Sequence, residues 1–170
     1  AELQPGNASY WHRLGQYWQL DLQKTDLSQA ILYYHRATET NPRSAVYWME
    51  LAGSYEMSGE PDRAWEAFEK AKSSYPVSSE VAWRSGNFLL RHGQLSPAFA
   101  EIRRSLVVDP RLTPLAVDLC WRASGDVERI LDEVLPPENS FYLRALHFFL
   151  SRVGIDPALT AWNRLLILEQ

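Results

Sequence analysis

The 170-residue sequence has little of what several common functional classes require. It contains a single cysteine, Cys120, so an intramolecular disulfide is impossible and the redox compartment cannot be inferred. No apolar run approaches the roughly 18 residues that a membrane-spanning helix needs. The formal net charge of -4 offers no electrostatic footprint for a phosphate backbone or an anionic membrane. We therefore expect no nucleic-acid partner and no direct membrane insertion of this segment.

Catalytic and metal-binding motifs are also missing. The sequence has no zinc-protease helix, no phosphate-cradling glycine loop and no nucleophile elbow. The adjacent carboxylates Asp132 and Glu133 would point about 100 degrees apart on a helix, which favours a solvated face over a shared proton. Cys120 is predicted to be a small core residue, since free cysteine is among the most buried residue types. We therefore expect no enzyme activity and no cofactor. We also expect no metal, because the histidines fall in different units and none has a second His or Cys ligand three or four residues further on: His12, His35, His92 and His147.

A spacing of 34 residues organises most of the chain. The central copy of the pattern consists of Trp48, Leu51, Ala52, Tyr55, Gly59, Ala64, Phe68, Ala71 and Pro76. Matching residues lie 34 positions earlier, at Ala30, Tyr34, Ala37 and Pro42. Others lie 34 positions later, at Gly93, Ala98, Ile102, Ser105 and Pro110. A fixed period of this length indicates stacked supersecondary units.

Each unit reads as a pair of helices. Apolar residues three and four apart form one helical stripe, a glycine marks a turn, and a second stripe follows. Ala30, Ala64 and Ala98 are expected where two antiparallel helices cross most closely, because only a small side chain allows that approach. Pro42 and Pro76 are expected to follow the second helices, since proline lacks the N–H donor and clashes with the preceding turn. One hairpin cannot bury its own apolar face, so neighbouring hairpins must stack.

On these residues the chain resembles the tetratricopeptide-repeat (TPR) family, in the form of a bacterial-type TPR array. The resemblance implies an all-α, right-handed superhelical solenoid of about ten helices in five antiparallel hairpins. It covers a single repeat domain, 1–170, with clear repeats over about 8–110 and degenerate repeats over about 111–170. It also implies a protein-interaction module whose first helices line a concave groove for a peptide or a partner helix.

Several helix boundaries can be predicted from capping residues. Asp26 with Gln29 three residues on forms a capping-box pattern, Ser44 and Ser78 or Ser79 are candidate N-caps, and Pro61 suits a first helical turn. Trp11 lies 37 rather than 34 residues before Trp48, which places three extra residues in the turn at 21–25.

The last two hairpins are less regular. The fourth is predicted as a helix at 113–123 and a short one at 127–135, stopped by Pro136 and Pro137. The fifth is predicted at 138–151 and 157–169, with Asp156 as the cap of its second helix.

The groove-lining side chains follow from projecting this pattern onto the first helices. The strongest candidate is Trp83 with Asn87 and Arg91, which are spaced i, i+4, i+8 and share one helix face. Trp83 could equally be core, because aromatic residues are commonly buried. Asn87 offers both a donor and an acceptor to a ligand backbone, although simple solvation remains an alternative. The full set of proposed binding residues is His12, Gln16, Met49, Glu56, Trp83, Asn87, Arg91 and Trp121.

The apolar cluster Leu165, Leu166, Ile167 and Leu168 spans slightly more than one helical turn, so at least one of these side chains must point outward. This predicts that the C-terminal end packs against a second copy, as a homodimer through the last helix, or against a further downstream segment. A short, bent last helix that buries everything is the alternative.

A further hypothesis makes the chain an accessory part of a larger membrane-anchored or enzymatic polypeptide. The sequence begins at Ala1 rather than at Met, which is consistent with a removed signal peptide or anchor as well as with an arbitrary boundary. The partner, the pathway and the cellular location therefore stay open.

Overall fold

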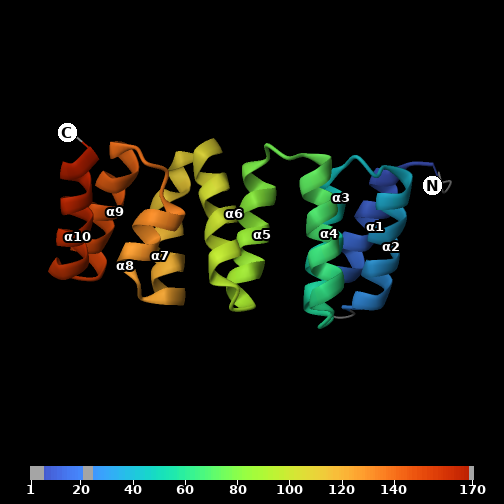
Figure 1. Ribbon diagram of the computed structural model, residues 1–170. Coiled ribbons are helices and arrows are strands. Elements are labelled where there is room, and N and C mark those ends of the chain that lie inside the picture. Colours follow the sequence, from blue (N-terminus) through green and yellow to red (C-terminus); the bar gives the residue numbers. More distant parts are fainter. Residues whose placement is uncertain (1–5, 21–24, 169–170) are drawn as a thin grey trace. The chain divides into compact units, whose positions relative to one another are not determined.

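The computed structural model describes residues 6–20 and 25–168, and these form helices with no strand among them. The chain divides into two compact units, Ala1–Val77 and Ser78–Gln170, and each is described by itself (Figure 1). The predicted single repeat domain over 1–170 therefore stays a prediction.

The N-terminal unit consists of two antiparallel helix hairpins. In the first, α1 packs against α2, in the second α3 packs against α4, and α2 contacts α3. The helices are α1 (Ala8–Leu20), α2 (Leu27–Thr40), α3 (Ala45–Met57) and α4 (Pro61–Ser74).

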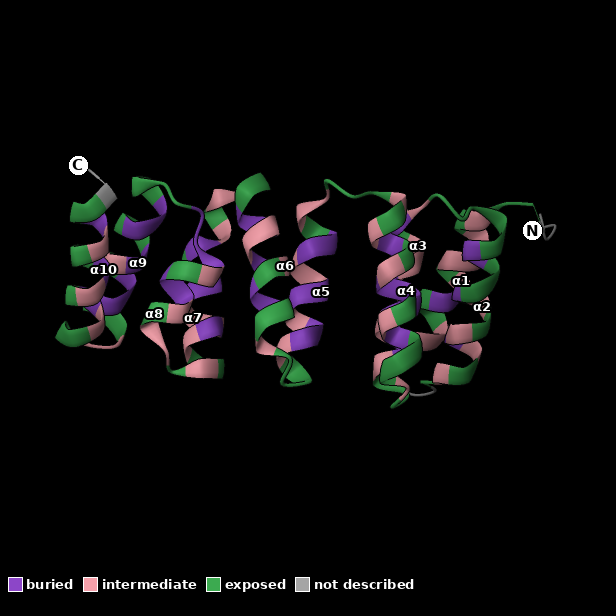
Figure 2. Cartoon of the chain, viewed as in Figure 1, coloured by how far each residue is buried: buried purple, intermediate pink, exposed green. Residues whose placement is uncertain are grey.

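The C-terminal unit contains the remaining hairpins. α5 packs against α6, α6 against α7 and η2, α7 against α9, and α9 against α10. Figure 2 shows buried and exposed positions alternating along α5 and α6, as expected for helices with one core-facing side. The elements are α5 (Ser79–Arg91), α6 (Leu95–Val108), η1 (Pro110–Leu112), α7 (Thr113–Ser124), α8 (Val127–Arg129), η2 (Ile130–Val134), α9 (Asn139–Arg152) and α10 (Ile155–Leu168).

The close helix crossings predicted from small residues are confirmed. Ala30, Ala64 and Ala98 are all fully buried. In the first hairpin, a Cβ added at Gly15 would lie 2.6 Å from the Tyr34 ring, closer than real side chains approach. The hydroxyl of Tyr34 donates to Oε1 of Gln19 at 2.6 Å, so the ring that fills this crossing also links the two helices.

The predicted helix ends are largely confirmed. The side chain of Asp26 accepts from the N–H of Gln29 at 3.0 Å, and that of Ser78 accepts from the N–H of Val81 at 3.2 Å. Ser44 occupies the N-cap position of α3 without a side-chain hydrogen bond, and α4 begins at Pro61. The three extra residues expected in the turn at 21–25 fall mostly outside the described residues.

The second helix of the last hairpin begins earlier than predicted. α10 starts at Ile155, so Asp156 lies inside its first turn and is not its cap. Gly154, the residue before α10, has a φ of 150 degrees, a backbone conformation that residues other than glycine rarely adopt. The N–H of Gly154 donates to the carbonyl of Phe149 at 2.8 Å. This turn closes α9 and allows α10 to begin one residue later.

The short helix predicted at 127–135 has an unexpected form. Only three residues are α-helical, and a π-helical segment, η2, follows, in which the N–H of Leu135 donates to the carbonyl of Ile130 five residues earlier. Two side chains from other helices bond to carbonyls of this segment. Arg103 Nη1 donates to Asp132 at 2.8 Å, and the buried hydroxyl of Tyr142 donates to Leu131 at 3.1 Å.

Cys120 lies in the core of the C-terminal unit, fully buried, as predicted. Burial raises the pKa of its thiol to about 12. The thiolate is the nucleophilic form, so this cysteine is inert at neutral pH.

Candidate binding surfaces

His12 lies between helices of the N-terminal unit. Its ring centroid is 5.0 Å from that of Tyr47 on α3 and 5.8 Å from that of Tyr34 on α2. Its Nε2 atom is buried and has no hydrogen-bond partner among the described residues. Burial lowers the pKa of His12, with Glu50 opposing and Arg13 adding to the shift. Burial therefore favours the neutral form of the His12 ring.

The other three N-terminal candidates differ in accessibility. Gln16 on α1 is exposed and Glu56 on α3 is half-buried. Met49 is only 2% exposed and belongs to the core, so its side chain does not form part of an accessible surface. The helical projection placed Met49 beside the groove because it used spacing alone, and spacing does not show how closely neighbouring helices cover a position.

The candidates on α5, Trp83, Asn87 and Arg91, occupy one face of that helix. The side chain of Asn87 is hydrogen-bonded to the backbone of the same helix. Its Nδ2 donates to the backbone carbonyl of Trp83 at 2.8 Å, one turn earlier. This bond orients the amide and leaves its oxygen as an acceptor for a ligand. Trp83 is half-buried against the C-terminal core, and Arg91 is exposed at the end of the helix.

Trp121 on α7 is also half-buried at the edge of this core. Its ring meets that of Phe149 edge-on, with centroids 5.7 Å apart. Trp83 and Trp121 thus each pack against the core with one side of the ring and face the surface with the other. For Trp83, the core position and the surface position considered from the sequence therefore both apply.

An accessible hollow lies between α7 and α9, and the sequence analysis did not identify it. Its volume is about 590 Å³. Leu115 on α7 and Leu143 on α9 each expose about half of their side-chain surface within it. We call it the α7/α9 groove, and its lining residues are Pro114, Leu115, Asp118, Leu143, Arg144, His147, Phe148, Ser151 and Arg152.

Positive charge prevails in the α7/α9 groove. Its one carboxylate, Asp118, is already paired with Arg122. On the opposite wall, Arg144 donates to the carbonyl of Pro110, while Arg152 has no ion-pair partner in the part of the chain that the structure describes. The groove therefore combines exposed leucines with basic groups, which suits a peptide carrying apolar and acidic side chains.

These α9 residues could have been found by the method used for the other first helices. Leu143, His147 and Ser151 are spaced i, i+4, i+8, as are Trp83, Asn87 and Arg91. The decay of the 34-residue spacing after Pro110 hid the equivalence.

Among residues 6–20 and 25–168, no group of His, Cys, Asp or Glu side chains could hold a metal ion. In the same residues, none of the helices has the length and apolarity required to cross a membrane.

Comparison with known proteins identifies the fold. No family model matches the sequence. One curated relative, small glutamine-rich tetratricopeptide repeat-containing protein 2 of Mycosarcoma maydis, is 29% identical over 85 residues, which is 50% of this chain and 24% of the relative. The match therefore spans about a quarter of that protein's length.

Solved structures align over most of the chain. MamA matches with a TM-score of 0.62 and 16% identity, covering 95% of this chain and 91% of that one. YrrB, a TPR protein described as having an unusual peptide-binding site, matches with a TM-score of 0.61 and 15% identity, covering 98% and 88%. The TPR domain of OM64 from Arabidopsis matches with a TM-score of 0.58 and 17% identity, covering 71% and 93%. The chain has an all-α TPR fold, and the resemblance drawn from its 34-residue spacing is confirmed.

Proposed function

We propose that the chain is a protein-interaction module that holds a peptide or partner helix against the first helices of its C-terminal unit. The observation that carries this proposal is the α7/α9 groove, which is open to solvent and exposes leucine side chains beside basic ones. Exposed apolar surface with a polar rim is a common mark of an interaction site. Trp83, Asn87 and Arg91 on α5 and Trp121 on α7 are proposed contacts on the same unit.

The chemistry of the groove defines the expected ligand. Leu115 and Leu143 would contact apolar side chains, Arg152 would attract carboxylates, and His147 would offer a hydrogen bond. An α-helix or an extended segment with apolar residues beside Asp or Glu satisfies both requirements. In the N-terminal unit, Gln16 and Glu56, with His12 nearby, form a separate proposed contact surface.

A peptide selection on the whole chain tests this function. Peptides would be selected from a random display library, and their dissociation constants measured by fluorescence anisotropy. Leu143→Asp should weaken binding at least tenfold, because it places a charge among the apolar contacts. Val107→Asp is the matched control, since Val107 is an exposed apolar residue on α6 outside the groove, and it should leave binding unchanged.

A double variant tests whether the α5 residues also contact the selected peptides. Trp83→Ala combined with Asn87→Ala should weaken the same peptides while far-ultraviolet circular dichroism stays close to that of the wild type. Peptides that bind Leu143→Asp as tightly as the wild type, or that respond only to Val107→Asp, would place the site elsewhere.

A further inference from the structure

The last hairpin carries an apolar face that nothing covers among the described residues. It forms a hollow of about 380 Å³ whose lining is apolar throughout. Leu159 and Trp162 on α10 are 52% and 44% exposed, and Ile155 is 70% exposed. We call this surface the α10 face, and its residues are Leu146, Leu150, Ile155, Ala158, Leu159 and Trp162.

The register of the repeats shows what such a face normally contacts. Ile155, Leu159 and Trp162 each lie 60 positions after a residue of α6, namely Leu95, Phe99 and Ile102. Phe99 and Ile102 are 0% exposed, and Leu95 is half-buried.

Phe99 and Leu95 belong to the core that α6 forms with the following α7 and η2, whereas Ile102 also lies against Gly86 of its own hairpin. α10 packs against α9 and α8, and no helix follows it in the described part of the chain. The α10 face therefore has the composition of a surface that receives the first helix of another hairpin.

The first helix of this same chain presents the complementary surface. Tyr10, Leu14 and Tyr17 on α1 are spaced i, i+4, i+7 and form one stripe. Thirty-seven positions later, the equivalent residues of α3 include Leu51 and Ser54, which are both buried.

Leu51 lines a small hollow whose wall includes His35 of α2 as well as residues of α4, and α2 packs against α3, so the surroundings of Leu51 include the preceding hairpin. On α1, by contrast, Leu14 is only half-buried and Tyr17 is 57% exposed. The α1 stripe is thus a first-helix surface without a preceding second helix among the described residues.

We propose that the α10 face binds the α1 stripe of a second copy of this chain. The contact repeats between copies the packing that the chain already forms between α2 and α3 and between α6 and α7. Two different surfaces meet in it, so the association is heterologous, and each added copy leaves one α10 face and one α1 stripe open. The assembly therefore grows with concentration instead of stopping at a symmetric pair.

Sedimentation velocity of the wild-type chain over a range from low to high micromolar concentration gives the first test. Species larger than the 19.6 kDa monomer should appear and increase with concentration. A chain that stays monomeric throughout would overturn the proposal.

Two single variants identify the surfaces. Leu159→Glu blocks the α10 face and Tyr17→Glu blocks the α1 stripe, and each should weaken self-association at least tenfold. Both positions are exposed, so the fold should persist, and Ile155→Glu provides a second variant of the α10 face. Val107→Glu is the matched control on α6 and should associate as the wild type does.

Mixing the two variants distinguishes a head-to-tail contact from a symmetric one. Tyr17→Glu retains an intact α10 face and Leu159→Glu retains an intact α1 stripe, so the mixture should form a 1:1 heterodimer that grows no further. If Leu159→Glu abolishes association while Tyr17→Glu has no effect, two α10 faces pair with each other and the proposal is wrong. A mixture that remains monomeric while the wild type associates would also overturn it.

Discussion

The second and fourth hairpins differ in how they hold their second helix. In the second, Ala64 sits fully buried at the crossing, and Phe68 and Ala71 fill the next turns of an unbroken α4. In the fourth, the N-cap Asp126 corresponds to Glu60, so the counterpart of Ala64 is Ile130, a larger residue that is also fully buried and begins the π-helical segment η2.

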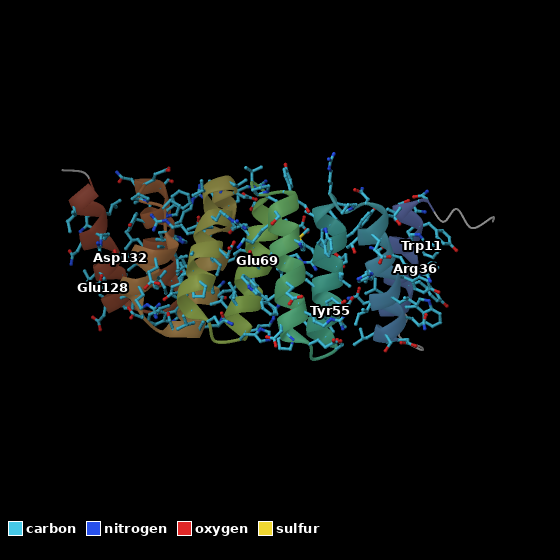
Figure 3. The ribbon with its side chains drawn as sticks, turned by 45° about the vertical axis from the view of Figure 1, so that its right-hand side comes forward. Trp11, Arg36, Tyr55, Glu69, Glu128 and Asp132 are labelled. Atoms are coloured by element: carbon cyan, nitrogen blue, oxygen red, sulfur yellow. The ribbon has the colours of Figure 1, made fainter. Side chains whose placement is uncertain are left out.

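Polar contacts are added on the exposed side of this segment. Asp132 pairs with Arg164 of α10 at 2.9 Å, and Arg164 also reaches Glu128 at 3.2 Å (Figure 3). Arg129 pairs with Glu133 at 2.7 Å and lies over the Phe99 ring. The contrast shows that the second helix of a hairpin can be held by a buried alanine at a close crossing, or by larger buried residues of a shorter π-helical segment with ion pairs on its exposed side.

The largest effect is expected at the crossing of the second hairpin. Ala64→Leu should overpack it and cost about 1–3 kcal/mol of stability, because three additional carbons meet a filled core. Asp132→Leu on the exposed side of η2 in the fourth hairpin should change stability by no more than about 1 kcal/mol, because an ion pair between partly exposed side chains contributes little.

Urea unfolding followed by circular dichroism compares the two variants, with Glu66→Leu as an exposed control on α4. If Ala64→Leu unfolds at the urea concentration of the wild type while Glu66→Leu does not, the register assigned to the repeats is wrong.

A smaller effect is expected at the π-helical segment. Tyr142→Phe removes the buried hydroxyl that donates to Leu131 and should cost about 0.5–1.5 kcal/mol, the net value of a typical hydrogen bond. Tyr75→Phe is the matched control because Tyr75 is exposed, and it should be neutral. Equal unfolding midpoints for the two variants would show that this bond contributes nothing to the fourth hairpin.

The smallest effect concerns the pH dependence of the N-terminal unit. Since burial lowers the pKa of His12 in the folded chain, the unfolded chain binds a proton first as the pH falls below about 6.5. Stability should therefore decline through that range and level off below the folded pKa. Comparing wild type with His12→Gln at pH 7.5 and pH 5.0 isolates this contribution, and unfolding midpoints that shift in parallel would contradict it.

The 34-residue spacing predicted most of the fold because close packing imposes it. A small residue is needed wherever two helices cross closely, and Ala30, Ala64 and Ala98 fill that role. Their spacing therefore indicates how often a close helix crossing recurs along the chain. The caps at Asp26 and Ser78 were predictable for a similar reason, since each satisfies backbone donors within its own turn.

The prediction that at least one side chain of the apolar C-terminal cluster points outward is confirmed, and its packing against a second copy or a downstream segment stays a prediction. Leu165 is buried whereas Leu166 and Ile167 are exposed, as the helical turn requires. The π-helical segment could not be predicted, because it depends on contacts from Arg103 and Tyr142, which lie on other helices.

The accessibility of the proposed binding residues was predicted less completely than the fold. Position along a helix placed Trp83 and Asn87 on one face, but it could not show that Met49 is covered. The stack of Trp11 on Tyr33, with Arg36 over the Trp11 ring at 5.0 Å, was also missed, because it joins residues of α1 and α2 that share no repeat position (Figure 3). Burial and contacts between helices are three-dimensional properties that spacing does not record.

Tryptophan indole resonances give the most direct test of the proposed binding function. The chain has seven tryptophans, whose side-chain N–H signals can be assigned with single Trp→Phe variants in proton–nitrogen correlation spectra. A saturating amount of a selected peptide should shift the signal of Trp121, which lies on α7 one turn beyond the groove residue Asp118, and leave that of Trp65 on α4 unchanged. A spectrum in which Trp65 shifts and Trp121 does not would contradict binding at the α7/α9 groove.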